Sequence, residues 1–253
     1  MRWDTGNKTT TASAPAEVKD GTQGGHEWRS VDISNYSEVA LATQGTDVTI
    51  VLSVVRTHPV MSFRVNGQGV YNAIKAAVAA GHDRLVNTGP KNDNMFNFRV
   101  TEEMPWHTGI GLYAITKGIG HEIARVFSVN YPIYVLTTLH GSFPINDGTG
   151  RFEHGTTKEV DEHGRWVRGS GLAQPFCATF PESADCVVRC VTVDLARMPS
   201  RHESFFVVGD TPDQTYSNAK AKRLLDWRPQ DDISGYWTRD PVFHPGNAGV
   251  SKL

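Results

Sequence analysis

The sequence predicts an α/β protein in which a parallel β-sheet carries helices on both faces. Short apolar, β-branched segments alternate along the chain with segments whose apolar residues recur at helical spacing. The segment 47–55 is almost continuously apolar, which is typical of a strand covered on both faces. A repeated order of strand, helix and strand is typical of parallel crossover connections.

Regular alternation of apolar and polar residues begins at His26 and predicts a first short strand. The elements expected up to residue 89 are a strand at 26–33, one or two helical turns at 36–43, a strand at 47–55, a helix at 60–80 and a strand at 84–88. Gly81 is expected to end the helix, and Gly89-Pro90 to end the strand that follows it.

The second half of the chain begins with a helix that runs from about residue 111 to Asn130. The elements expected after it are a strand at 131–139, a helix at 183–198 ended by Pro199, a strand at 204–208 and a helix at 218–225. Ligands of such sheets bind beyond the carboxyl ends of the strands. The loops after Ile33, Ser53, Thr88 and Leu139 are therefore expected to open onto one edge.

Composition and charge are those of an ordinary globular protein. The chain has 253 residues and a formal net charge of -2, so we expect neither nucleic acid nor a membrane as partner. We find no apolar run of the ~20 residues that cross a bilayer, and no secretory signal near Met1. Three cysteines argue against disulfides and for a reducing, cytoplasmic location. Cys186 and Cys190 are expected to be buried thiols, and no metal site is expected.

Tyr113 and Lys117 are the most informative residues of the chain. They lie four residues apart in a predicted helix, so their side chains share one face. A phenol is a poor base at neutral pH, but a nearby ammonium favours the phenolate and lowers its pKa. Such a pair could move a proton on a substrate hydroxyl, and the lysine could also bind a ribose. Taken alone, the spacing is more often that of a side-chain pair on a surface helix.

Several ordered motifs surround this pair. They are Val31-Asp32-Ile33, the strand end Leu52-Ser53-Val54, the run Asn66-Gly67-Gln68-Gly69-Val70-Tyr71-Asn72, the strand Arg84-Leu85-Val86, the helix Tyr113-Ala114-Ile115-Thr116-Lys117 with Gly120, and Leu224-Leu225-Asp226-Trp227-Arg228-Pro229. With these motifs the chain resembles the NAD-dependent epimerase/dehydratase family, the extended branch of the short-chain dehydrogenase/reductase superfamily. The resemblance covers roughly residues 26–230.

The resemblance implies an incomplete Rossmann-like parallel sheet with helices on both faces and a small C-terminal, substrate-side region. The expected parts are a flexible tail at 1–25, a Rossmann-like core at 26–141, a substrate-side region with returning core elements at 142–230 and a C-terminal tail at 231–253. The irregular segment 142–172, rich in Gly, His and charged residues, belongs to the substrate side and is expected to form excursions or a lid.

The resemblance also implies an activity: an NAD- or NADP-dependent oxidoreductase, epimerase or dehydratase acting by hydride transfer on a sugar, a sugar nucleotide or a similar hydroxyl compound. It would allow a homodimer. The implied catalytic residues are Tyr113, Lys117 and Thr88; the cofactor residues are Asp32, Ile33, Leu52, Ser53, Val54, Asn66, Tyr113 and Lys117; the substrate residues are His140, Trp166 and Arg168.

Two departures from the family pattern bear on that activity. The family begins with a strand and a glycine-rich turn that binds the cofactor pyrophosphate, and here no such unit precedes residue 26. The glycines of 21–25 are read as a loop. The sheet would then expose an apolar edge unless a partner or the tail covers it. The catalytic serine of the family falls on Pro90, so Thr88 would have to replace it.

Three interpretations stay open: an active enzyme, a non-catalytic relative kept for binding or assembly, and a truncated chain. The remaining polar residues are read as structural. His121, His154 and His163 do not have metal-ligand spacing, and Glu102-Glu103 is read as a solvated loop.

Overall fold

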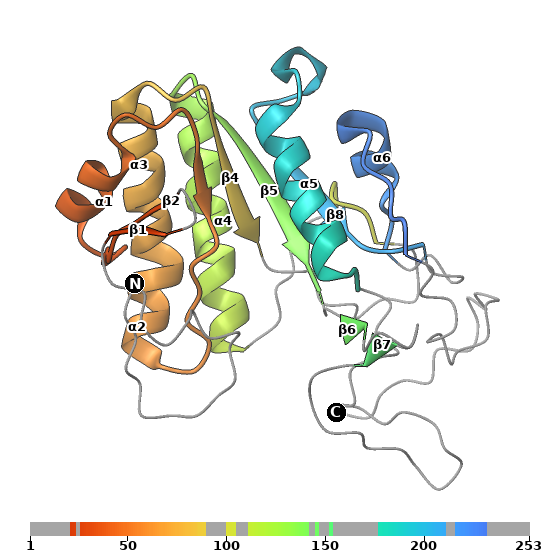
Figure 1. Ribbon diagram of the computed structural model, residues 1–253, viewed down its shortest axis with the longest axis horizontal. Helices are drawn as coiled ribbons and strands as arrows, with labels where there is room; N and C mark the ends of the chain where they lie inside the picture. Colours follow the sequence, from red (N-terminus) through yellow and green to blue (C-terminus); the bar gives the residue numbers. More distant parts are fainter. Residues whose placement is uncertain are drawn as a thin grey trace, which may run out of the picture.

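The computed structural model describes residues 21–23, 26–89, 100–104, 111–141, 145–146, 152–153, 177–210 and 216–231. Its centre is a four-stranded sheet with the order β3-β4-β5-β8 (Figure 1), and every pair of neighbouring strands is parallel. The strands are β3 (Thr49–Val51), β4 (Arg84–Gly89), β5 (Tyr134–His140) and β8 (His202–Val207). The predicted α/β class with a parallel sheet is confirmed.

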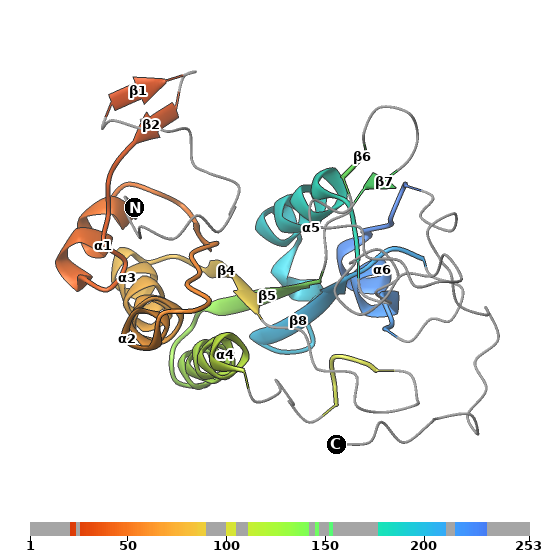
Figure 2. The same cartoon turned by 90° about the horizontal axis from the view of Figure 1, so that it is seen from below.

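Helices cover both faces of this sheet, as Figure 2 shows end-on. The helices on one side are α1 (Tyr36–Thr43), α3 (Val70–Ala80) and α4 (Leu112–Asn130); those on the other side are α5 (Phe180–Thr192) and α6 (Ala219–Leu225). Neighbouring residues of one strand alternate between the two cores. Leu85 packs with α3 and α4, whereas Val86 packs with α5 and α6. The near-continuous apolar strands are explained by this burial on both faces.

The long helix predicted for 60–80 is present, with an unpredicted change of winding in its middle. It consists of α2 (Pro59–Phe63), a π-helical turn η1 (Arg64–Gly69) and α3. A Cβ on Gly120 of α4 would collide with the Asn66 carbonyl oxygen, so the two helices touch backbone to backbone here. Gly81 ends α3 with φ 80, as predicted for a left-handed C-cap.

The first predicted strand is largely wrong. Only β2 (His26–Trp28) is a strand, and it pairs antiparallel with β1 (Gly21–Gln23), where a loop was expected, outside the main sheet. The reason is local hydrogen bonding further on. The Asp32 carboxylate accepts hydrogen bonds from the backbone N–H and the hydroxyl of Ser34, both at 2.9 Å. This turn leads into α1 and competes with a strand.

The helix predicted for 183–198 begins earlier and ends earlier. Thr179 forms a capping box with Glu182, which fixes the start of α5 at Phe180. At the other end the Arg84 guanidinium donates to the carbonyls of Val191 and Val193, at 2.8 and 2.7 Å. These bonds satisfy carbonyls that a continuing helix would have used. A short 3-10 turn, η2 (Leu195–Arg197), follows.

The remaining described elements are short. Strands β6 (Ile145–Asn146) and β7 (Phe152–Glu153) pair antiparallel. All three cysteines are buried as free thiols, which confirms the expectation for Cys186 and Cys190. Within the described segments, no helix combines the length and the apolar character that a membrane crossing requires.

The two edges of the sheet differ. At the β8 edge the backbone N–H of Phe206 donates to the Glu102 carboxylate at 2.8 Å. The Glu102 side chain is largely buried, and this burial raises its pKa to about 7. The prediction of a solvated loop is therefore wrong for Glu102; of the two residues, only Glu103 is exposed. At the other edge, Ile50 and Leu52 are 42% and 62% exposed, and no described strand pairs outside β3. The described chain thus leaves the expected apolar edge uncovered.

Because of two histidines, His121 in the middle of α4 and His202 at the start of β8, we expect stability to fall in acid. The rings of His121 and His202 lie 4.7 Å apart. Burial is the main cause that lowers their pKa values, to about 3 for His121 and about 4 for His202, and the charge of His202 lowers the pKa of His121 further. The nearby charged groups are Glu122, Arg125, Glu203 and Lys220.

Because both folded-state pKa values lie below the unfolded value of about 6.5, the unfolded chain binds more protons in acid. Their contribution to stability is complete above about pH 6.5 and is lost as the pH falls toward 4, by about 1.4 kcal/mol per pH unit and site. Urea unfolding at several pH values measures this. In His121→Gln, unfolding in acid should take up about one proton fewer than in the wild type. The control is His26→Gln, which replaces an exposed histidine. An unchanged slope in the first variant contradicts the assignment.

Candidate active site

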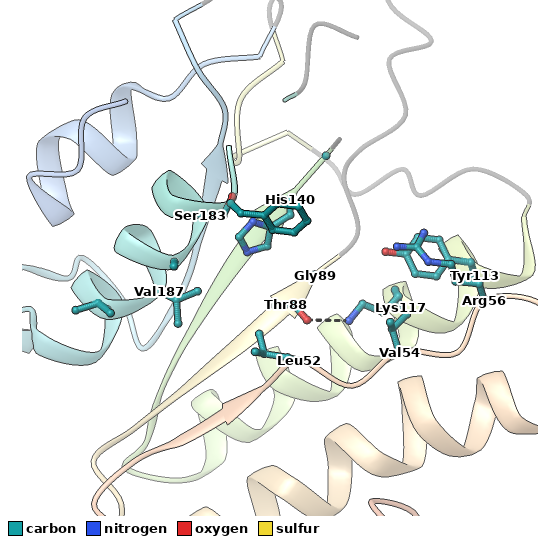
Figure 3. A pocket seen from close by; sticks show the side chains of 14 residues that line it. Leu52, Val54, Arg56, Thr88, Gly89, Tyr113, Lys117, His140, Ser183 and Val187 are labelled. Carbon is teal, nitrogen blue, oxygen red and sulfur yellow. Dashed lines mark hydrogen bonds between the residues drawn. The ribbon is translucent and has the colours of Figure 1, made fainter. Parts of the chain in front are cut away.

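A cavity of about 740 Å³ opens where the carboxyl ends of β3, β4 and β5 meet α4 and α5 (Figure 3). This is the edge at which ligands of parallel sheets bind. One wall is formed by strand ends and α4, and the opposite wall by the first turns of α5. The described lining residues are Leu52, Val54, Arg56, Thr88, Gly89, Tyr113, Lys117, His140, Gly141, Phe180, Ser183, Ala184, Val187 and Val188.

Tyr113 and Lys117 lie one turn apart in α4, and both line the cavity. The ammonium of Lys117 is buried and donates to the Thr88 hydroxyl at 3.1 Å, across to β4. That hydroxyl in turn donates to the carbonyl of Val51 at 3.0 Å. Thr88 therefore holds Lys117 in place. Its own proton is already used, so it is not free to donate to a substrate in this arrangement.

The cation that acts on Tyr113 is Arg56. Its guanidinium carbon lies 4.6 Å from the centre of the Tyr113 ring (Figure 3). Burial raises the pKa of Tyr113, and the charge of Arg56 partly opposes this rise. Burial, and then Arg56, lower the pKa of Lys117 to about 8. At neutral pH the phenol thus keeps its proton, while the ammonium stays mostly charged.

Asn66 fixes the loop that carries Arg56. Its amide oxygen accepts from the backbone N–H of Val55 at 3.0 Å, and its amide nitrogen donates to the Val55 carbonyl at 2.7 Å. The same nitrogen donates to the Thr116 hydroxyl of α4 at 2.9 Å. Asn66 is fully buried and does not line the cavity. Its place in the structure is that of a bridge between the Val55 loop and the helix of Tyr113.

His140 ends β5 and lines the cavity. One ring nitrogen lies 2.9 Å from the Thr138 hydroxyl. Burial and the charge of Lys117 lower the pKa of His140 to about 4, so the ring is neutral at physiological pH. A neutral imidazole can donate or accept a hydrogen bond, but it adds no charge to the site.

The structure brings only part of the predicted set together. Of the predicted residues, the cavity collects Leu52, Val54, Thr88, Tyr113, Lys117 and His140. Ser53 lies beside it but is not in the described lining, and Asp32 and Ile33 lie at the start of α1. The Ile33 carbonyl accepts from Asn72 at 3.0 Å. Trp166, Arg168, Pro90, His154 and His163 lie outside the described residues.

Sequence reasoning missed Arg56 and the wall supplied by α5. Arg56 follows a predicted strand end, and its position in a loop at the carboxyl edge was a usable signal. Val187 packs against the core beneath its helix and lines the cavity as well. Among the described residues, no group of three or more His, Cys, Asp or Glu could hold a metal ion.

Comparison with solved structures identifies proteins with a similar fold. Glucuronic acid dehydrogenase from Chromohalobacter salexigens superposes with a TM-score of 0.67 at 17% identity, over 85% of this chain and 73% of that chain. A mutant uronate dehydrogenase from Agrobacterium tumefaciens, complexed with NAD, gives 0.60 at 16% identity, over 85% and 73%. A UDP-galactose 4-epimerase gives 0.60 at 13% identity, over 85% and 82%.

No protein-family profile matches the sequence, and no curated protein matches it either. At these low identities the structural likeness concerns the fold. The chain thus has the Rossmann-like α/β fold found in these dehydrogenases and epimerases.

Proposed function

We propose that this chain is an NAD(P)-dependent oxidoreductase or epimerase of the NAD-dependent epimerase/dehydratase family, acting on a hydroxyl group of a sugar-like substrate. The observation that carries the proposal is the convergence of Tyr113, Lys117 and Thr88 on one cavity at the carboxyl edge of the sheet. The solved structures with this fold include uronate dehydrogenases, one of them complexed with NAD, and an epimerase.

The residues of the cavity suit the nicotinamide half of a dinucleotide. Its apolar wall, which includes Leu52, Val54 and Val187, could cover a flat ring, and the buried ammonium of Lys117 could donate to ribose hydroxyls. A bound nicotinamide would supply hydride transfer. Among the described residues, no strand followed by a glycine-rich turn is present to hold the pyrophosphate.

The residues of this chain would handle the proton. Tyr113 is protonated at neutral pH and would donate its proton to the oxygen of a carbonyl being reduced, or take it back from a hydroxyl being oxidised. Lys117, fixed by Thr88, would orient the ligand, while Arg56 would favour negative charge on the phenol oxygen. His140 would remain neutral and offer a hydrogen bond.

Titration with NADH tests the proposal, with energy transfer from the six tryptophans as the signal. We expect saturable binding below millimolar concentrations, weakened in Lys117→Ala and unchanged in Lys75→Ala, which removes an exposed lysine of α3. Oxidation of a uronic acid with NAD or NADP should then be measurable from the nicotinamide absorbance. Absence of binding up to millimolar NADH would refute the enzyme and favour a binding or assembly role.

A further inference from the structure

We infer that Arg56 is the anion-binding residue of the cavity and holds a carboxylate or phosphate group of the bound ligand beside Tyr113. The inference rests on the proposed function only in taking this cavity as the ligand site. It names the chemical class of the ligand: a compound with an apolar or ring portion and one anionic group. The sequence motifs assign no role to Arg56.

The charged side chains in the described lining of the cavity are positive. Its described lining contains two cations, Arg56 and Lys117, and neither Asp nor Glu. The two cations oppose each other, because Arg56 is one of the two causes that lower the pKa of Lys117. An anion placed next to them would relieve that repulsion and would itself be stabilised by both charges.

The two cations differ in the hydrogen-bond donors that each can still offer to a ligand. The ammonium of Lys117 is buried and already donates to Thr88. Arg56 is exposed, and among the described residues no oxygen accepts a hydrogen bond from its guanidinium, which rests on the face of the Tyr113 ring. A guanidinium in this position can turn its edge, with its fork of N–H donors, toward a ligand. This fork matches the two oxygens of a carboxylate or phosphate.

Contacts of its backbone neighbour and of its guanidinium restrict the position of Arg56. Its backbone follows Val55, which Asn66 clamps through both its N–H and its carbonyl, and Tyr113 supports its guanidinium. A donor that is held in place loses less entropy on binding than a mobile surface arginine. The anion would lie close to the phenol, and its distance from the reacting hydroxyl would then select among substrates.

Equilibrium binding tests the inference without requiring turnover. Isothermal titration with glucuronic acid and glucose isolates the carboxylate, since the two sugars differ at that group; titration with inorganic pyrophosphate tests the phosphate of a dinucleotide. Arg56→Gln should weaken binding of glucuronic acid, of pyrophosphate or of both by about 10- to 100-fold, and leave glucose within about 2-fold. Which ligand responds identifies the source of the anion.

The matched control is Arg64→Gln, which removes an exposed arginine of η1 outside the described cavity lining and changes net charge equally. It should leave all three affinities unchanged, and thermal unfolding should show both variants folded. The inference is overturned if the wild type binds neither anion better than glucose, or if the two variants behave alike. Failure of NADH binding would refute the proposed function separately, because these titrations contain no nicotinamide.

Discussion

Tyr113→Phe is expected to lower kcat by about 100- to 10,000-fold, the usual contribution of a positioned acid or base. The substitution removes one oxygen and keeps the ring that lies under Arg56, so the shape of the cavity should persist. Dissociation constants for NADH and for glucuronic acid should change by no more than about 2-fold, because the lost interaction belongs to the transition state. Steady-state kinetics and fluorescence titration measure the two quantities.

The control is Tyr71→Phe, since Tyr71 lies on α3, is 42% exposed and is not among the described residues of the cavity. Its kcat should equal that of the wild type. Unchanged turnover in Tyr113→Phe would remove Tyr113 from the mechanism. Loss of binding in proportion to kcat would make it a binding residue instead.

The favoured direction of the reaction and its pH dependence follow from the burial of the Tyr113 phenol. The pKa of Tyr113 lies above its ordinary value, because burial outweighs the charge of Arg56. The protonated phenol suits reduction of a carbonyl at neutral pH. Oxidation of a hydroxyl should therefore speed up as the pH rises, as long as Lys117, with a pKa of about 8, keeps its charge.

Elements with a long, regular pattern could be predicted from the sequence. The helix carrying Tyr113 and the parallel strands have a strong period or a continuous apolar run, and the structure has them within a few residues of the expected bounds. The first strand could not be predicted beyond Trp28. Asp32 is compatible with alternation, but its carboxylate bonds to Ser34 and turns the backbone.

Site residues that a sequence motif defines could be predicted. Contacts that depend on the three-dimensional fold could not. Tyr113 and Lys117 share a helical face by spacing alone. That Arg56, rather than Lys117, acts on the phenol depends on the path of a loop held by Asn66. Likewise, the engagement of the Thr88 hydroxyl depends on a carbonyl of the neighbouring strand, and sequence spacing carries no information on that contact.

Trp227→Ala is expected to cost about 3–5 kcal/mol of unfolding free energy, a large part of the 5–15 kcal/mol of a typical domain. Trp227 is fully buried in the core between α5, α6 and the sheet. Asp226, just before it, has φ 53 and ends α6 in the left-handed conformation that usually favours glycine. This turn directs the indole inward.

Urea unfolding measures the loss, and Trp28→Ala is the matched control, because Trp28 is 40% exposed and should cost less than about 1 kcal/mol. Similar losses in both variants would contradict the role of Trp227 in the core.

A second variant separates packing from hydrogen bonding. The indole N–H of Trp227 donates to the carbonyl of Glu182 at 3.0 Å, and the Glu182 carboxylate accepts from the backbone of Gln230 and Asp231. Trp227→Phe keeps most of the ring but removes the indole donor to that carbonyl, at about 0.5–1.5 kcal/mol. Since Glu182 lies in the first turn of α5, beside Phe180 and Ser183 of the cavity wall, this variant should also weaken glucuronic acid binding. Unchanged binding would show that the wall keeps its place without this bond.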